Sequence, residues 1–409
     1  MTAGVGGSTF AAELARLQPP PDTPQPIPLD DLHARVAKAQ QLMQAQGIDA
    51  LYLDTSTNLR YFTGMALHLT ERLHGAVIPA RGPIAYLSPA FEAPKTQECM
   101  RLPAPIHTWE EHEDPTALVI DTLRGMGLPG GTLALDPLTP FFTVDGLRRA
   151  GNSFSLANAA PVTAACRMVK SANEIALMQH ANTITLAVQQ AAARALAPGM
   201  ETPEVQAFLD AAHRRMGALP ASRAVQFGEA TAYPHGVPYP QTLRDGDMVL
   251  IDTGCFVHGY RSDITRTYVF GTPTPRQREI WDLERRAQQA GFAAAALGAP
   301  CEAVDAAARA TIHAALDPGG FGRDYATPGL PHRTGHGIGM DVHEESYMVR
   351  GNRTPLVPGM CFSIEPTICI YGEFGVRLED IVYMTGEGPR WFTQPCRSVD
   401  DPFGIEDAA

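Results

Sequence analysis

The sequence predicts two α/β domains, a smaller one at the N-terminus and a larger, internally duplicated α+β domain at the C-terminus. Its 409 residues exceed the usual size of one compact core. Short apolar runs alternate with helical stretches up to about residue 165, and two similar strand pairs follow further on. We therefore expect a proline-rich tail over residues 1–28, an N-terminal domain over 29–165 and a C-terminal domain over 166–409.

Composition narrows the class of protein. Hydrophobic residues make up 44% of the chain and charged residues 19%, which is typical of a soluble globular protein. The net charge of -12 argues against nucleic acid, because phosphate binding needs a basic surface. The seven cysteines include no C-x-x-C pair, which favours reduced thiols in a cytoplasm. We find neither a secretory signal nor a run of 18 apolar residues, so we expect a cytoplasmic protein without membrane contact.

The N-terminal part reads as alternating helices and strands. Prolines between Pro19 and Pro28 exclude a helix there. A helix fits Asp30 to Gln46 and ends at Gly47. Strand-like apolar runs follow at residues 50–53, 76–78, 84–87 and 132–135. This part contains no catalytic constellation.

Helices and strand-rich regions also alternate in the C-terminal part. Ser171-Ala-Asn-Glu174 is a capping box that opens a helix running to about Leu196. Further helices are expected over residues 202–216, 276–297 and 301–316, and the strand-rich regions are 245–271 and 357–386.

The two strand-rich regions resemble each other. In each, a carboxylate that ends an apolar run follows a glycine by six residues: Asp252 follows Gly246, and Glu365 follows Gly359. A second carboxylate, Asp263 or Glu379, then opens the next apolar run. This repetition predicts a duplicated sheet.

Acids at the ends of buried strands need a compensating charge. Neighbouring strands of each pair can direct two carboxylates at one point, and four converging carboxylates repel unless cations lie between them. The segment His332-Arg-Thr-Gly-His336-Gly-Ile-Gly-Met-Asp-Val-His343 lies between the two regions and adds three histidines in a glycine-rich loop. We interpret the whole as a metal site.

This combination resembles a known family. Asp252, Asp263, His336, Glu365 and Glu379 are similar to the ligand set of the pita-bread metallopeptidases. The segments Gly-Tyr-Arg-Ser-Asp263-Ile-Thr-Arg-Thr and 332–344 resemble the proline-specific branch, the Xaa-Pro dipeptidases (prolidases) and Xaa-Pro aminopeptidases, as do residues 58–64 and 168–170. The resemblance covers roughly residues 30–400. It implies a creatinase-like N-terminal domain and a C-terminal pita-bread domain.

The resemblance also implies a mechanism. Asp252 would chelate one metal, Asp263 and Glu379 would bridge two, and His336 and Glu365 would complete the other. Four carboxylates and one imidazole favour two Mn²⁺ ions, with Zn²⁺ or Co²⁺ as alternatives. A water shared by the two ions would attack the Xaa-Pro bond, with Glu365 as general base.

Other residues receive roles from the same resemblance. His235 and His343 would flank the substrate during catalysis, and His332 would shape the proline pocket. Arg377, two residues before Glu379, would face the same side of its strand and pair with the metal-site acids.

The sequence departs from many relatives after His343. It reads Glu-Glu-Ser-Tyr-Met-Val-Arg, without the His-Glu-x-Pro pattern, and only thirteen residues separate Glu365 from Glu379. The substrate carboxylate therefore falls to Arg350 or Arg353, and Tyr347 lines the pocket, as hypotheses. The chain length favours a dipeptidase over an Xaa-Pro aminopeptidase acting on longer peptides, and the latter remains the alternative.

Several rival classes share the fold. A metal-free creatinase-like enzyme or a pure binding protein would not need all five ligand types. Methionine aminopeptidases normally lack the N-terminal domain, and a carbon–sulfur lyase on the same scaffold stays open. The expected partner is a small peptide with proline at its second position, and relatives suggest a homodimer or homotetramer.

Overall fold

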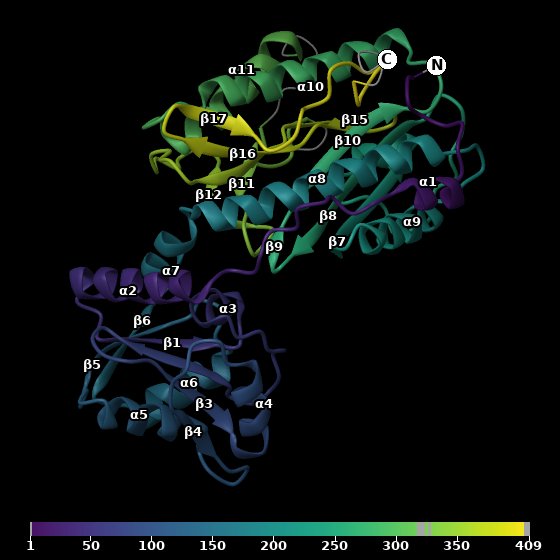
Figure 1. The fold of residues 1–409 in the computed structure, drawn as a ribbon. Coiled ribbons are helices and arrows are strands. Elements are labelled where there is room, and N and C mark those ends of the chain that lie inside the picture. The colour runs from purple at the N-terminus through teal and green to yellow at the C-terminus, as the bar shows by residue number, and fades with distance from the viewer. Residues whose placement is uncertain (1, 317–323, 326–328, 405–409) are drawn as a thin grey trace. The chain divides into compact units, whose positions relative to one another are not determined.

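The computed structural model describes residues 2–316, 324–325 and 329–404. The chain divides into two compact units, which Figure 1 colours by sequence. One unit is Pro26–Arg167. The other joins Met1–Gln25 to Met168–Ala409.

The unit Pro26–Arg167 is built on one six-stranded sheet with the order β4-β3-β2-β1-β5-β6. Its strands are β1 (Ala50–Asp54), β2 (Gly75–Pro79), β3 (Ala85–Pro89), β4 (Ile106–Trp109), β5 (Gly131–Leu135) and β6 (Phe154–Asn158). Its helices are α2 (Leu29–Gln46), α3 (Thr57–Thr63), η1 (Ala90–Glu92), α4 (Ala93–Cys99), α5 (Pro115–Gly125), α6 (Phe141–Ala150) and α7 (Ala160–Arg167).

The strongest sequence signals of this unit are confirmed. Helix α2 ends at Gly47, whose φ of 69° is the left-handed conformation that glycine adopts without strain. The apolar run at residues 50–53 is the fully buried central strand β1. The other three expected strands correspond to β2, β3 and β5. Strands β4 and β6 were not predicted, and both lie at the edges of the sheet.

The other unit carries three sheets. The first has the order β10-β8-β7 with β9 paired to β8, the second has the order β12-β11-β13-β16-β17, and β14 pairs with β15. The strands are β7 (Leu219–Phe227), β8 (Met248–Val257), β9 (Tyr260–Arg261), β10 (Ile264–Val269), β11 (Gly335–Gly337), β12 (Glu344–Met348), β13 (Cys361–Ile364), β14 (Thr367–Ile370), β15 (Phe374–Arg377), β16 (Asp380–Thr385) and β17 (Gly388–Trp391).

The predicted duplication appears as two antiparallel pairs that meet. Strand β8 pairs with β10, and β13 pairs with β16. A bridge between Thr265 and Glu379 joins the start of β10 to the residue before β16. The acid-bearing ends of both pairs therefore come to the same place.

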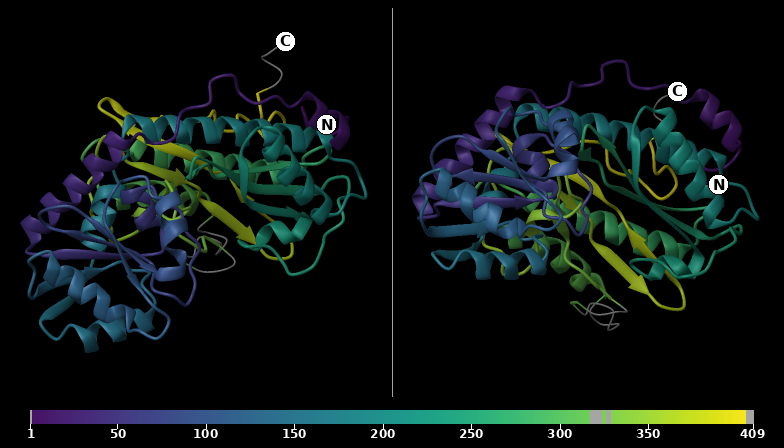
Figure 2. Two further views of the ribbon diagram at one scale, coloured as in Figure 1. Left: turned by 60° about the horizontal axis from the view of Figure 1, so that its bottom comes forward. Right: turned by 90° about the horizontal axis from the view of Figure 1, so that it is seen from below.

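Helices cover these strands. They are α1 (Phe10–Arg16), α8 (Ala172–Ala195), α9 (Thr202–Arg215), η2 (Gly228–Ala232), α10 (Pro275–Ala294) and α11 (Cys301–Leu316). Helix α8 runs along the outside of the strands (Figure 2, left), and α10 and α11 lie side by side (Figure 1). The capping box predicted at Ser171 is present, with both Ser171 and Glu174 bonded reciprocally. Within the described residues, no helix is long and apolar enough to cross a bilayer.

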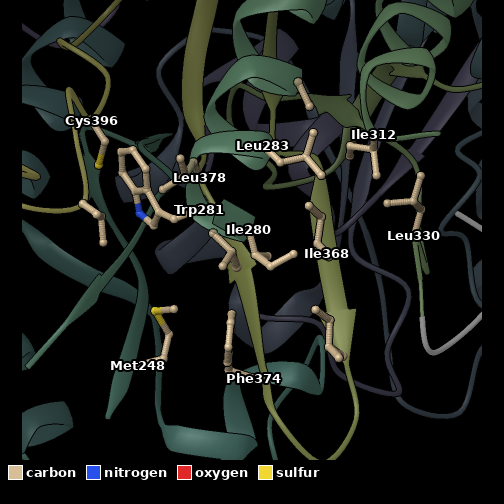
Figure 3. Packing of buried hydrophobic residues seen from close by; sticks show 14 of the residues in the cluster. Met248, Ile280, Trp281, Leu283, Ile312, Leu330, Ile368, Phe374, Leu378 and Cys396 are labelled. Atoms are coloured by element: carbon tan, nitrogen blue, oxygen red, sulfur yellow. The ribbon is translucent and has the colours of Figure 1, made fainter. Parts of the chain in front are cut away.

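A core between α10 and the strands fixes the helix against the sheets. Figure 3 shows Ile280, Trp281 and Leu283 of α10 facing the side chains of the strands. The indole nitrogen of buried Trp281 donates to the Thr267 carbonyl at 2.7 Å. This bond ties α10 to β10, two residues from the bridge at Thr265.

The N-terminal segment differs from the expected tail. Residues 10–16 form helix α1, which packs against α8 and α9. Phe10 stacks on Phe208 with ring centroids 4.7 Å apart, and buried Glu13 bonds Arg194. The prolines that exclude a helix lie only after residue 18, so they do not prevent residues 10–16 from forming one.

Candidate active site

A cavity of about 730 Å³ opens in the C-terminal unit. All five predicted ligands line it. The other charged or titratable residues among its described lining are His235, Arg261, Tyr325, His332, Arg333, His343 and Arg377. The acids converge because Asp252 lies within β8 and the other three lie next to the ends of β10, β13 and β16, at the junction between the duplicated pairs.

Asp263 and Glu379 occupy the centre of this junction. The Glu379 amide donates to the Thr265 carbonyl at 3.1 Å, and the Thr265 hydroxyl donates to Glu379 Oε2 at 2.6 Å. Both acids are at least nine-tenths buried. Asp263 Oδ1 and Glu379 Oε1 nevertheless find no hydrogen-bond partner among the described residues. Orphaned buried carboxylate oxygens are costly, so each calls for a ligand.

His336 and Glu365 form the next pair. His336 lies on β11, and its Nε2 lies 3.0 Å from Glu365 Oε1 and 3.9 Å from Glu379 Oε1. Its Nδ1 lies 3.0 Å from the Gly337 carbonyl, which directs Nε2 toward the acids. The Ser363 hydroxyl donates to the same Oε1 of Glu365 at 3.1 Å.

Asp252 sits on β8 and is held by Arg377. The Arg377 guanidinium donates to Asp252 Oδ2 at 2.7 Å, to the Thr265 hydroxyl at 3.2 Å and to the Pro234 carbonyl at 3.1 Å. Arg377 therefore connects one acid of the site to the loop that carries His235.

The electrostatics fit a bound cation. Burial, followed by repulsion from Asp252, raises the pKa of Asp263 well above its ordinary value. Burial and the charge of Glu365 do the same to the pKa of Glu379. Although burial lowers the pKa of His336, its bond to Glu365 and the surrounding acids raise it overall. The imidazolium thus compensates charge that a metal ion would otherwise compensate.

The ligand atoms are also close enough for one ion. One atom each of Asp263, His336 and Glu379 lies within 4.8 Å of the other two. Oxygen donors with one imidazole suit a divalent cation. The buried orphan oxygens, the mutual repulsion and the donor set all fit the metal.

The histidine loop places two further imidazoles at the cavity. The His343 ring packs edge-on against His336, with centroids 4.3 Å apart. His332 Nδ1 lies 2.7 Å from the Arg333 carbonyl. Burial is the main cause that lowers the pKa of His332. His235, on the loop after η2, is exposed and also lines the cavity.

Helix α11 holds the base of this loop. Asp305 accepts from the Thr334 amide at 3.1 Å and from its hydroxyl at 2.7 Å. Arg309 pairs with Asp305 at 2.9 Å and donates to the His332 carbonyl at 2.5 Å. The buried Asp305–Arg309 pair therefore orients His332.

Two hypotheses about the substrate pocket need correction. Arg350 is 63% exposed and turns to Asp324, and Arg353 is 88% exposed near Glu302. Neither they nor Tyr347 belong to the described lining of the cavity. Instead, the Tyr347 ring carries the Arg333 guanidinium at 4.2 Å, so Tyr347 supports an arginine that does line the cavity.

The residues that sequence reasoning missed include Arg261 and Arg333, which line the cavity, and Thr265, whose hydroxyl bonds Glu379. All three lie inside the two quoted motifs, in Arg261-Ser-Asp263-Ile-Thr265 and in His332-Arg333. Alternation along a strand places Arg261 and Thr265 on the same face as Asp263. Both residues are therefore predictable from the sequence alone.

Comparison with known proteins agrees with this geometry. Residues 35–169 match the creatinase/prolidase N-terminal domain, and residues 176–386 match metallopeptidase family M24. "Probable dipeptidase PepE" of Mycobacterium tuberculosis is 35% identical over 87% of this chain and 92% of its own length. The "Xaa-Pro dipeptidase" of Lactobacillus helveticus is 32% identical over 87% and 95%. The solved structure of dipeptidase PepE from Mycobacterium ulcerans has a TM-score of 0.82 at 32% identity, covering 90% of this chain and 97% of that one.

The fold and the site together define a pita-bread hydrolase with a creatinase-like N-terminal domain. The chain belongs to metallopeptidase family M24, in its prolidase branch. Membership in this family implies divalent metal ions.

Proposed function

We propose that the protein hydrolyses the peptide bond of Xaa-Pro dipeptides with two divalent metal ions. The convergence of Asp263, His336 and Glu379, with orphaned buried oxygens between them, carries the proposal. The Xaa-Pro dipeptidase of Lactobacillus helveticus, similar over most of its length, supports this substrate class. Hydrolysis of longer peptides from their N-terminus is the second candidate.

The metal would be held by the five lining ligands Asp252, Asp263, His336, Glu365 and Glu379. Their four carboxylates favour Mn²⁺, with Zn²⁺ and Co²⁺ as alternatives. When bound, the ions would polarise the scissile carbonyl and lower the pKa of the attacking water.

Glu365 is placed to move the proton of that water. Its Oε1 accepts from the Ser363 hydroxyl at 3.1 Å, which orients the carboxylate that would accept the proton. The Glu365 amide donates to the Thr334 carbonyl at 2.7 Å, so the backbone is held as well. This carboxylate can then deliver the proton to the leaving proline nitrogen.

The histidines hold the substrate on either side. His343 is fixed by its contact with His336, and His235 lies on the loop bonded by Arg377. Both imidazoles can donate to oxygens of the scissile amide. His332, held from α11, shapes the side where the proline ring lies.

Arg333 is our candidate for binding the free carboxylate of the dipeptide. It lines the cavity next to His332, and its guanidinium is supported by Tyr347. No hydrogen bond or ion pair joins its side chain to another described residue. A guanidinium held on an aromatic face and free to donate suits a carboxylate.

Proline release from Leu-Pro, measured after chelation and after Mn²⁺ is added back, tests the activity. We expect loss and recovery, with Leu-Gly cleaved far more slowly. Full activity of the chelated protein would overturn the metal mechanism. Efficient cleavage of Leu-Pro-Gly, matching that of Leu-Pro, would favour the aminopeptidase instead.

The variant Arg333→Gln separates the two candidates further. We expect kcat/KM for Leu-Pro to fall by at least about tenfold, while that for Leu-Pro amide, which lacks the carboxylate, changes little. Equal losses on both substrates would contradict the role of Arg333.

We also propose a cytoplasmic location and a homodimer or homotetramer. The seven cysteines are all unpaired thiols, which supports a reducing compartment. Light scattering of the purified chain measures the oligomeric state directly.

A further inference from the structure

Arg261 has no assigned role although it lines the cavity. It lies on β9, two residues before Asp263, so the alternation of the strand directs both side chains to the same face. Ser262 between them points the other way and bonds Thr185 of α8 at 2.7 Å. Arg261 therefore faces the substrate side of the sheet and not the core.

Among the described residues, the Arg261 side chain packs against one aromatic ring. Its guanidinium lies over the Phe256 ring at 4.8 Å. No hydrogen bond or ion pair joins this side chain to any described residue, and its Nε is buried without a partner. A buried guanidinium donor of this kind is expensive unless a ligand accepts from it.

A second orphaned group lies on the same sheet. The hydroxyl of Ser222 on β7 lines the cavity, is buried and has no partner. Ser222 pairs across the sheet with Gly254 of β8. Because Gly254 lacks a side chain, nothing of that residue blocks the space between Ser222 and the strand that carries Arg261.

The charged residues of the cavity leave these donors without an anionic partner. Its described lining contains four carboxylates, Asp252, Asp263, Glu365 and Glu379. Two divalent ions would neutralise those acids. The arginines Arg261, Arg333 and Arg377 then remain, of which Arg377 pairs with Asp252 and Arg333 is assigned to the substrate carboxylate. Arg261 is the arginine among these three that has no assigned anionic partner.

We propose that Arg261, with Ser222, binds a carboxylate side chain on the residue before proline, so that the enzyme prefers Glu-Pro and Asp-Pro. This inference rests on the proposed function. A dipeptide with an acidic first residue carries one net negative charge, which complements the remaining positive charge of the cavity. Guanidinium and hydroxyl donors that are already desolvated suit a carboxylate.

The test compares Glu-Pro with Gln-Pro, which has nearly the same shape without the charge. We expect kcat/KM for Glu-Pro to exceed that for Gln-Pro by at least about tenfold in the wild type. Arg261→Gln should bring this ratio to about one, because kcat/KM falls more for Glu-Pro than for Gln-Pro. Arg261→Lys should retain most of the preference, and Arg261→Glu should shift it toward Lys-Pro. Metal content, measured by mass spectrometry, should be equal in all variants.

Binding provides a readout that does not depend on turnover. Calorimetry of the Mn²⁺-loaded protein should show that free L-glutamate binds at least about tenfold more tightly than L-glutamine, and Arg261→Gln should abolish the difference. Equal cleavage of Glu-Pro and Gln-Pro by the wild type would overturn the acidic preference. Equal losses on both substrates in Arg261→Gln would overturn it too, and would assign Arg261 to the terminal carboxylate. If no Xaa-Pro dipeptide is cleaved, the proposed function itself fails.

Discussion

The hydroxyl of Thr265 is shared between a carboxylate and a guanidinium. It donates to Glu379 at 2.6 Å and accepts from Arg377 at 3.2 Å, while Arg377 holds Asp252. One buried hydroxyl thus orients two of the proposed metal ligands. Loss of a group that orients a metal ligand commonly lowers the affinity for the metal.

Replacing this hydroxyl should weaken metal binding. We expect Thr265→Val to raise the Kd for Mn²⁺ by about 10- to 100-fold, measured by calorimetry. The control is Thr267→Val. Thr267 lies on the same face of β10, and its hydroxyl bonds backbone atoms of Arg377, at 2.7 and 3.2 Å. A similar loss of affinity in both variants would mean that β10 itself, and not the Thr265 hydroxyl, matters.

At the scale of single residues, all five proposed metal ligands line the cavity, whereas the proposed substrate contacts Arg350, Arg353 and Tyr347 are not among its described lining. Asp252 and Glu365 end apolar runs, so strand alternation alone indicates that their side chains point inward. Arg350 and Arg333 both lie in loops, where no periodicity sets the direction of a side chain. Their directions depend on Asp324 and on the Tyr347 ring, contacts that only the folded structure defines.

At the scale of elements, helix α1 fastens the start of the chain to the C-terminal unit. Glu13 is fully buried and bonds Arg194 of α8 at 2.8 Å and Arg16 at 2.7 Å. Although burial raises the pKa of Glu13, its bonds to Arg194 and Ser8 lower it overall. The charged form is therefore the stable one in the folded protein.

Neutralising Glu13 should loosen this segment. We expect Glu13→Gln to lower the free energy of unfolding by about 1–2 kcal/mol, because it weakens a buried pair whose arginine partner is partly exposed. Arg16→Ala is the control, since the Arg16 side chain is 66% exposed and should contribute less than about 0.5 kcal/mol. Urea unfolding measures both. An unchanged midpoint for Glu13→Gln would show that the charge of Glu13 contributes nothing to stability.

A hydrogen-bonded chain links three elements behind the site. His213 of α9 bonds the Leu209 carbonyl through Nδ1, which leaves Nε2 to accept from Thr185 of α8 at 3.2 Å. Thr185 in turn contacts the Ser262 hydroxyl at 2.7 Å, next to Asp263. Burial lowers the pKa of His213 to about 4, so the neutral ring is the form that this chain requires.

The stability of the C-terminal unit should therefore fall in mild acid. Between pH 6.5 and about 4 the unfolded chain binds a proton at His213 that the folded protein does not, so the free energy of unfolding decreases as pH falls. From pH 7 to 5 this one residue should account for about 2 kcal/mol. Urea unfolding of metal-free protein should show a smaller decrease for His213→Gln. Identical decreases in both proteins would contradict the assignment.

The elements found from sequence share strong local signals. Ser171 and Gly47 mark helix ends by side-chain capping and by the left-handed conformation. Strands β4 and β6 lack such signals because they are edge strands, whose side chains are only partly buried. The hydrophobic pattern of a sequence indicates which side chains are buried, so it does not identify edge strands whose side chains are only partly buried.

At the scale of the whole molecule, the two strand pairs that carry the acids meet although their carboxylates repel one another. The bridge between Thr265 and Glu379 closes the junction, and α10 packs behind it through Trp281. The fold therefore holds mutually repelling carboxylates close together, and a bound cation would reduce their repulsion. Metal binding and stability of this unit should be coupled.

Removing the metal and removing one charge should have opposite effects. Adding Mn²⁺ at about 100 times its Kd should stabilise the wild type by about 2.7 kcal/mol. Asp263→Asn removes a carboxylate that burial and Asp252 already disfavour in its charged form. We expect the metal-free variant to unfold at the same or a higher urea concentration than the metal-free wild type, yet to gain almost nothing from Mn²⁺. Glu387→Gln, at an 84% exposed side chain, should behave as the wild type in both states. If Mn²⁺ does not shift the unfolding midpoint of the wild type, these acids do not bind the metal. If the metal-free Asp263→Asn variant is markedly less stable than the metal-free wild type, repulsion between the acids does not limit the stability of the metal-free protein.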